Sequence, residues 1–232
     1  EDLQDELASA QAALSKANVA LREALTEAEG VNQSSGGIFD DPTGNPEAVL
    51  SVLQNITKQL DKLQRRSEDF SRYQRLFGKT VYTYRALRET IKLRTQRYEL
   101  WSSLRDLEAQ SKEWMEAPEF RELDAEMIGI AITGFHRTAS MLHRRLRSGA
   151  TELLMERIEV WRQRLPALLA LGNVSMKERH WVKIFSKDML EEPYVPGVTR
   201  VQLSLLVELG VFEDRFRENI LSISSAATGE AS

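Results

Sequence analysis

Long runs of apolar residues at helical spacing are the feature that most constrains the fold of this chain. The clearest run keeps a heptad spacing, broken only by Ser67 and Gln74, through Leu53, Ile56, Leu60, Leu63, Phe70 and Phe77. A heptad of this length places one apolar stripe along a helix of many turns. No comparable run alternates apolar and polar residues as a strand would. The sequence therefore predicts an all-α fold, an elongated stack of antiparallel helical bundles with long amphipathic helices.

Capping and turn residues predict where the helices begin and end. Asn45-Pro46 is typical of a helix start, and Gly78 of a helix end. A second long helix is expected from about residue 80 to Trp114, because Ala117-Pro118 would break it. Further helical patterns cover residues 124–147, 154–171, 203–209 and 212–223. Thr199 is expected to cap the helix at 203–209, after an irregular stretch at 191–197.

The first part of the chain differs from the rest in composition. Residues 1–30 form an acidic amphipathic heptad with alanine at every a position, and we interpret them as a tail-side or packing segment. Residues 31–45 contain Ser34-Ser35-Gly36-Gly37 and are expected to be a flexible loop. Residues 46–232 then make one helical region. The chain does not begin with methionine, which suggests a fragment.

Composition excludes several classes of function. The chain has no cysteine, so it has no disulfide, thiolate zinc site or cysteine nucleophile. A net charge of −4 argues against nucleic acid as the main partner. No apolar run approaches the length of a membrane span. We therefore expect neither a nucleic-acid nor a membrane partner.

Residue patterns that could carry chemistry are weak. Gly78-Lys79-Thr80 resembles the end of a phosphate-binding loop but lacks the earlier glycine and the preceding strand, so a helix stop is favoured. His136 and His143 share a helix with several arginines, which disfavours a metal site. No carboxylate pair or activated serine is apparent. The sequence predicts no catalytic residue, no cofactor and no metal, and hence no enzyme.

A corner between two helices lies at residues 158–185. Pro166 should kink the first helix, and Gly172-Asn173 is expected to close it with a left-handed residue. Ser175-x-x-Glu178 has the spacing of a capping box for the second helix, which would bury Trp181. His180 is interpreted as a hydrogen-bonding residue that orients the corner. All four tryptophans are expected in the core, at positions Trp101, Trp114, Trp161 and Trp181.

Basic residues are dense between positions 58 and 105. They are Lys58, Lys62, Arg65, Arg66, Arg72, Arg75, Lys79, Arg85, Arg88, Lys92, Arg94, Arg97 and Arg105. One interpretation is a solvated helix face. The other is a docking surface for an acidic protein partner, with Arg65, Arg66, Arg72 and Arg75 as its candidate contacts.

A series of landmarks resembles the linker region of dynein heavy chains. In that region a leucine–tryptophan pair is followed by a second tryptophan, a proline and an F-x-x-L-D segment, as in Leu100-Trp101, Trp114, Pro118 and Phe120-x-x-Leu123-Asp124. An LP…L.N…RHW pattern comes later, as in Leu165-Pro166, Leu171, Asn173 and Arg179-His180-Trp181. An A-x-G-E close is similar to residues 227–230. The resemblance covers about residues 60–230, and it departs from the family where Val174 replaces the usual proline after the asparagine.

The resemblance implies a structural signature and a mechanical role. The signature residues are Trp101, Trp114, Leu165, Pro166, Asn173, Arg179, His180 and Trp181. The role is that of the N-terminal lever of the linker, which swings over the AAA+ ring and transmits the ATP-driven stroke of a microtubule motor to the tail. The implied partners are the ring of the same heavy chain and neighbouring tail or dynein subunits, with microtubules reached only through the parent motor. The implied location is the cytoskeleton of the cytoplasm, with the axoneme of a cilium or flagellum favoured.

Two other classes of protein also have long amphipathic helices. A spectrin-like rod or tethering scaffold would show an internal repeat, and no repeat at a fixed period is present. A helical-bundle enzyme would need polar ligands that project inward, and the apolar stripes lack them. Both alternatives remain open at this point.

Overall fold

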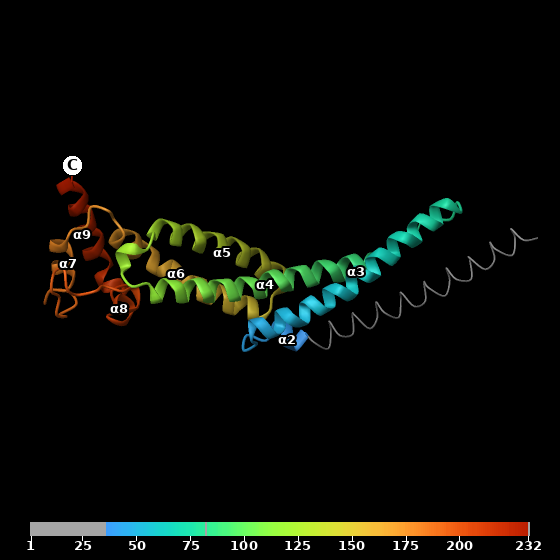
Figure 1. Ribbon diagram of the computed structural model, residues 1–232, viewed down its shortest axis with the longest axis horizontal. Helices are drawn as coiled ribbons and strands as arrows, with labels where there is room; N and C mark the ends of the chain where they lie inside the picture. The colour runs from blue at the N-terminus through green and yellow to red at the C-terminus, as the bar shows by residue number, and fades with distance from the viewer. Residues whose placement is uncertain (1–35, 82, 232) are drawn as a thin grey trace, which may run out of the picture. The chain divides into compact units, whose positions relative to one another are not determined.

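The computed structural model describes residues 36–81 and 83–231, and this part of the chain is helical without strands (Figure 1). The elements are α2 (Gly36–Asp40), α3 (Pro46–Leu76), α4 (Arg85–Glu116), the 3-10 turn η1 (Phe120–Glu122), α5 (Ala125–Leu146), α6 (Gly149–Leu171), α7 (Glu178–Ile184), α8 (Leu203–Glu208) and α9 (Asp214–Ala231). The predicted all-α class is confirmed. The heptad expected at residues 1–30 lies outside the described residues.

The chain divides into two compact units. The first holds the described residues up to Ser102 together with Ser148–Thr151, and the second holds Ser103–Arg147 and Glu152–Ser232. α4 and α6 each contribute residues to both units.

In the first unit, α3 begins and ends as the sequence predicts. The Asn45 side chain accepts a hydrogen bond from the backbone N–H of Ala48 at 3.1 Å, and Pro46 occupies the first turn, where its missing donor is not needed. Gly78 follows the helix with φ of 60°, a left-handed conformation that favours glycine. The Gly78-Lys79-Thr80 stretch is therefore a helix stop. Beyond it α4 packs its apolar side against α3, through Leu60, Leu63 and Leu87 with Ile56, Tyr84 and Ile91 around them.

The loop expected at 31–45 contains a structured turn, which corrects that expectation. Residues 36–40 form α2, and Phe39 is fully buried. The Trp101 indole N–H donates to the Phe39 carbonyl at 3.0 Å, and the Arg97 guanidinium lies 4.9 Å from the centre of the Phe39 ring. A side chain at Gly44 would approach the Trp101 ring to 2.7 Å, so only glycine fits there. Contacts with a helix far along the chain thus order this segment.

In the second unit, the later part of α4 packs with α5 and α6. The rings of Trp114 and Trp161 meet edge to face, with their centres 4.9 Å apart. The Asp124 carboxylate caps α5 by accepting from the N–H groups of Glu126 and Met127, each at 3.0 Å. Arg147 closes α5 with a left-handed φ of 49°. The break at Ala117-Pro118 and the start of α5 match the sequence predictions.

The later helices differ from expectation in their ends. α8 begins at Leu203, and its cap residue Gln202 makes no side-chain cap bond. The Thr199 hydroxyl accepts from the N–H of Val195 at 2.8 Å instead. The predicted Thr199 cap is therefore wrong. α9 extends to Ala231 and so includes residues 227–230, which were expected to lie beyond a helix ending near 223. The irregular stretch at 191–197 is confirmed.

Candidate functional site

The corner between α6 and α7 is held to α9 by the Asn173 side chain. The Asn173 amide nitrogen donates to the Ser224 carbonyl at 3.1 Å and to the Thr228 hydroxyl at 2.8 Å. Its amide oxygen accepts from the N–H of Ser175 at 2.9 Å. One asparagine therefore closes the turn after α6 and fastens it to α9, with both ends of its amide satisfied.

Two neighbouring residues of α7 converge on Glu230 at the end of α9. The Arg179 guanidinium pairs with the Glu230 carboxylate, with Nε 2.9 Å from Oε2. His180 is fully buried, and its Nε2 lies 3.2 Å from the same carboxylate oxygen. The hydrogen bond from Arg179 is the main cause that lowers the pKa of Glu230, and the charge of Arg179 acts in the same direction. This ion pair keeps Glu230 charged against α7.

The second nitrogen of His180 caps its own helix. The N–H of Lys177 donates to His180 Nδ1 at 2.9 Å, so Nδ1 carries no proton and Nε2 is the donor toward Glu230. His180 sits at the third position of α7, where a capping box places a Glu or Gln that reaches back to the cap residue. The ammonium of Lys177 cannot accept, so only this half of the box forms. His180 therefore makes hydrogen bonds through both ring nitrogens, and its role in orienting the corner stays a prediction.

Trp181 fills the space under the corner. It is 1% exposed and meets the Phe120 ring edge to face, with the centres 6.1 Å apart. The Arg121 guanidinium lies 5.7 Å from the Trp181 ring. The N–H of Phe120 donates to the Val201 carbonyl at 2.6 Å, which anchors the turn that carries both residues. The F-x-x-L-D segment thus supplies a ring against Trp181 at one end and the cap of α5 at the other.

A second polar group lies at the start of α7. The Tyr194 hydroxyl donates to the Glu178 carboxylate, which also pairs with Arg121 at 2.9 Å. Burial, and then the hydrogen bond to Glu178 and its charge, raise the pKa of Tyr194 to about 12. The same hydrogen bond is the first cause that lowers the pKa of Glu178. Tyr194 was not predicted as part of the corner, since nothing in its local sequence pattern points to a partner on α7.

Two predictions about the corner are wrong. Ser175 does not cap α7, whose cap residue is Lys177. Neither Gly172 nor Asn173 has a left-handed φ. The glycine is needed for another reason, because a side chain at Gly172 would come within 2.5 Å of the Ala125 side chain. The glycine is therefore required by the close approach of α5 to the end of α6, and not by a left-handed backbone conformation.

The other signature residues take up separate positions. Trp101 belongs to the first unit, while Trp114 packs on Trp161 in the second. All four tryptophans are buried, as predicted. Pro166 is exposed within α6, which continues past it to Leu171, and Leu165 beside it is half-buried. The proline therefore does not end the helix, and the kink stays a prediction.

The four candidate docking arginines share one helix. Arg65, Arg66, Arg72 and Arg75 all lie exposed on α3. Within residues 36–81 and 83–231 none of them makes an ion pair. Their role as a docking surface stays a prediction.

Two other kinds of site are absent from the described residues. No group of three or more His, Asp or Glu side chains could hold a metal ion. No helix of that part of the chain is long and apolar enough to cross a membrane. The corner, with its buried histidine and its two ion pairs, is an arrangement that fastens helices together.

Comparison with known proteins gives the chain its family. Residues 85–232 match the family described as "Dynein heavy chain, N-terminal region 2". The chain is similar to human dynein axonemal heavy chain 6, with 26% identity over 192 residues, or 82% of the chain. It is also similar to human dynein axonemal heavy chain 3, with 29% identity over 188 residues, or 79% of the chain. It spans about 4% of the length of each of these relatives.

The matched region contains the α6–α7 corner and all of its partners. The relatives are axonemal heavy chains, which favours that class among the dyneins. The chain belongs to the dynein heavy chain family, in its N-terminal region 2.

Proposed function

We propose that this chain is the N-terminal lever portion of the linker of an axonemal dynein heavy chain. The observation that carries the proposal is the match of residues 85–232 to N-terminal region 2 of these heavy chains. In this role the chain is a mechanical element that swings over the AAA+ ring and transmits the ATP-driven stroke to the tail. It works in the axoneme of a cilium or flagellum and reaches microtubules only through the parent motor.

The local structure supports a stiff element. α3 and α4 are continuous helices of 31 and 32 residues, and no loop interrupts either one. A continuous helix of this length can carry force along its axis. The corner fixes α7 to α9 through Asn173, Arg179 and His180. A lever needs both long continuous helices and firmly held joints, because a joint that yields under load would absorb the stroke.

Energy transfer in the parent motor tests the lever role. One dye is placed at Thr133, exposed on α5, and the other on the AAA+ ring of the same heavy chain. The transfer efficiency is expected to differ between the nucleotide-free and the ATP-bound motor, because a lever changes its position over the ring. Equal efficiency in all nucleotide states would contradict the proposal.

The proposed lever does no chemistry of its own. Titration calorimetry of the 232-residue chain with ATP, ADP and Mg²⁺ is expected to show no binding heat. Tight binding of any of these would overturn a purely mechanical role. The ring of the parent motor supplies ATP hydrolysis.

The exposed arginines of α3 are the proposed contact of the lever with an acidic surface. The ring of the same heavy chain or a neighbouring tail element would provide this surface. Four guanidinium groups on one helix, none of them in an ion pair within residues 36–81 and 83–231, support the proposal, because guanidinium groups form paired hydrogen bonds with carboxylates.

A further inference from the structure

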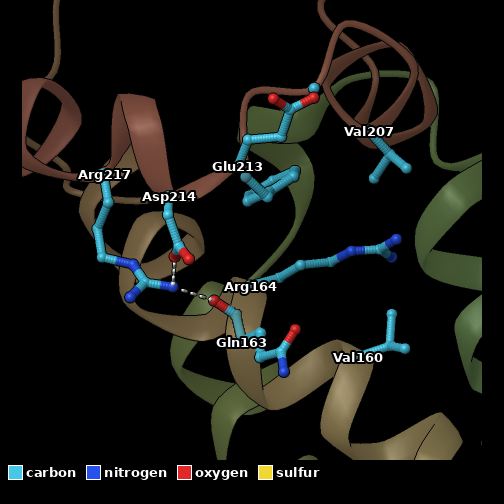
Figure 2. A pocket seen from close by; sticks show the side chains of 9 residues that line it. Val160, Gln163, Arg164, Val207, Glu213, Asp214 and Arg217 are labelled. Carbon is cyan, nitrogen blue, oxygen red and sulfur yellow. Dashed lines mark hydrogen bonds and ion pairs between the residues drawn. The ribbon is translucent and has the colours of Figure 1, made fainter.

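A hollow in the second unit lies between α6, α8 and α9 (Figure 2). Its volume is about 660 Å³. Val160, Val207 and Phe212 give it apolar walls, and charged side chains project into it from α6 and from the start of α9. None of these residues takes part in the α6–α7 corner.

Most charged groups of the hollow already have partners. Arg217 pairs with Asp214 at 2.7 Å and donates to the Gln163 carbonyl at 3.4 Å, in the turn of α6 before Pro166. Glu213 pairs with Arg215 at 2.8 Å. These contacts neutralise both carboxylates and one of the two arginines that line the hollow.

Arg164 is the exception. Its side chain is half-buried, and its guanidinium lies 5.3 Å from the centre of the Trp161 ring. Figure 2 shows the side chain extended across the hollow between Val160 and Val207, away from the Asp214–Arg217 pair. Within residues 36–81 and 83–231 it has neither a hydrogen bond nor an ion pair with a carboxylate. Burial lowers the pKa of Arg164 because no negative charge compensates for the lost hydration.

A half-buried cation without a counter-ion is unfavourable and gains from an anion that enters the hollow. We propose that the hollow binds a protein segment that carries an Asp or Glu side chain next to an apolar one. The carboxylate pairs with Arg164, whose planar fork suits two parallel hydrogen bonds. The apolar side chain packs against the exposed Val160.

Charge favours a carboxylate over a phosphate group. The carboxylates of Glu213 and Asp214 are already paired with Arg215 and Arg217, so within the described residues Arg164 is the one lining guanidinium without a carboxylate partner. A singly charged carboxylate matches it, whereas a phosphate dianion would leave one negative charge uncompensated. The exposed Val160 offers an apolar contact that a free phosphate cannot use. The site does not depend on the lever role, since it rests on contacts inside one unit.

Nuclear magnetic resonance of the whole 232-residue chain tests the site. The probe is the peptide acetyl-Leu-Glu-Leu-amide, and the signals followed are the Arg164 Nε–H and the Trp161 indole N–H. The peptide is expected to shift both signals in a saturable way at millimolar concentration. The matched peptide acetyl-Leu-Gln-Leu-amide, which lacks the charge, is expected to leave them unchanged.

Variants on one helix separate the site from a general charge effect. Arg164→Gln is expected to weaken binding about tenfold or more, because a charge-assisted pair is lost. Arg162→Gln, on the same helix but paired with Glu159 and His136, is expected to bind as the unchanged chain does. Arg164→Lys keeps the positive charge but lacks the planar guanidinium, so it is expected to bind the Glu peptide with intermediate affinity. This variant takes the place of Arg164→Gln if Arg164→Gln does not fold.

Three results would overturn the proposal. The first is the absence of any shift with the Glu peptide, and the second is equal binding by Arg164→Gln. The third is a stronger response to inorganic phosphate than to the peptide, which would make the hollow a phosphate site. Failure of the lever experiment would leave all three results unaffected.

Discussion

At the scale of single residues, the corner divides its work between polar and apolar side chains. Asn173, Arg179 and His180 form directional bonds to α9, so they fix which surfaces meet. Trp181 contributes buried apolar area, and its indole N–H has no hydrogen-bond partner within the described residues. Its contribution to stability is therefore expected to come from packing.

Truncation of Trp181 tests this division. Trp181→Ala is expected to lower the free energy of unfolding by about 3–5 kcal/mol, because a large buried ring leaves a cavity. Trp181→Phe is the control. It keeps a ring against Phe120 and removes an N–H that makes no bond, so its loss is expected to be clearly smaller. Denaturant unfolding followed by circular dichroism measures both, and a loss below about 1 kcal/mol for Trp181→Ala would contradict its place in the core.

The Tyr194–Glu178 bond makes a second prediction, on pH. A tyrosine that ionises at about 12 when folded and near 10 when unfolded stabilises the fold fully below pH 10. That contribution is lost as the pH rises from 10 to about 12, because ionised Tyr194 cannot donate to Glu178. The pKa of Glu178 is lowered, so its own contribution is lost in acid, as the pH falls below its ordinary range.

Ultraviolet titration of tyrosinate measures this shift. The difference between the unchanged chain and Tyr194→Phe should be a step near pH 12. Above pH 10 the stability of Tyr194→Phe should also fall less steeply than that of the unchanged chain. A difference step near the ordinary value of 10 would show that the hydrogen bond is absent in solution.

At the scale of elements, local sequence predicted the helices far better than their joints. Asn45 caps α3 through the N–H of Ala48, only three residues away, so its local pattern was sufficient. The fold of α2 depends on Trp101, which is 62 residues further along the chain. The capping of α7 by His180 follows no common residue pattern. α2 depends on a tertiary contact and the cap of α7 on an unusual residue, so the local sequence pattern predicted neither.

Gly172 gives an element-scale prediction. Gly172→Ala would bring its side chain to 2.5 Å from that of Ala125, so the end of α6 and the start of α5 must separate. The free energy of unfolding is expected to fall by about 1–3 kcal/mol, as for other overpacked sites.

Gly134→Ala is the matched control for that change. A side chain there meets nothing within 4 Å, and the site lies inside α5. A gain of about 0.5–1 kcal/mol is expected, because alanine favours the helix. Thermal unfolding compares the two variants, and a neutral Gly172→Ala would mean that this approach is looser than the structure indicates.

At the scale of the whole molecule, the charge is small but unevenly placed. The chain carries 31 basic and 35 acidic side chains, a net charge of −4. The exposed arginines of α3 stand out against this balance. Periodicity and composition predicted the all-α class, and composition singled out the arginines that lie exposed on α3. They could not separate a docking surface from a solvated face, because both have the same sequence pattern.

Charge reversal in the parent motor separates these two interpretations. The variant replaces Arg65, Arg66, Arg72 and Arg75 with glutamate and changes the net charge of this chain from −4 to −12, with 27 basic and 39 acidic side chains. If the arginines contact an acidic surface, the reversal produces repulsion at each contact, and microtubule gliding is expected to slow. The matched variant with lysine at the same positions keeps the charge and is expected to glide at close to the normal speed.

The isolated chain provides the control for folding. All four positions are exposed, so the thermal unfolding of the reversed chain is expected to change little. The new glutamates lie near Glu68 and Asp69 on α3, and each like-charged pair there is expected to cost about 0.2–0.5 kcal/mol. Slow gliding with an intact fold supports a docking surface. Normal gliding with the reversed residues would show that the basic face is only solvated, and the lever would then contact its partner through another surface.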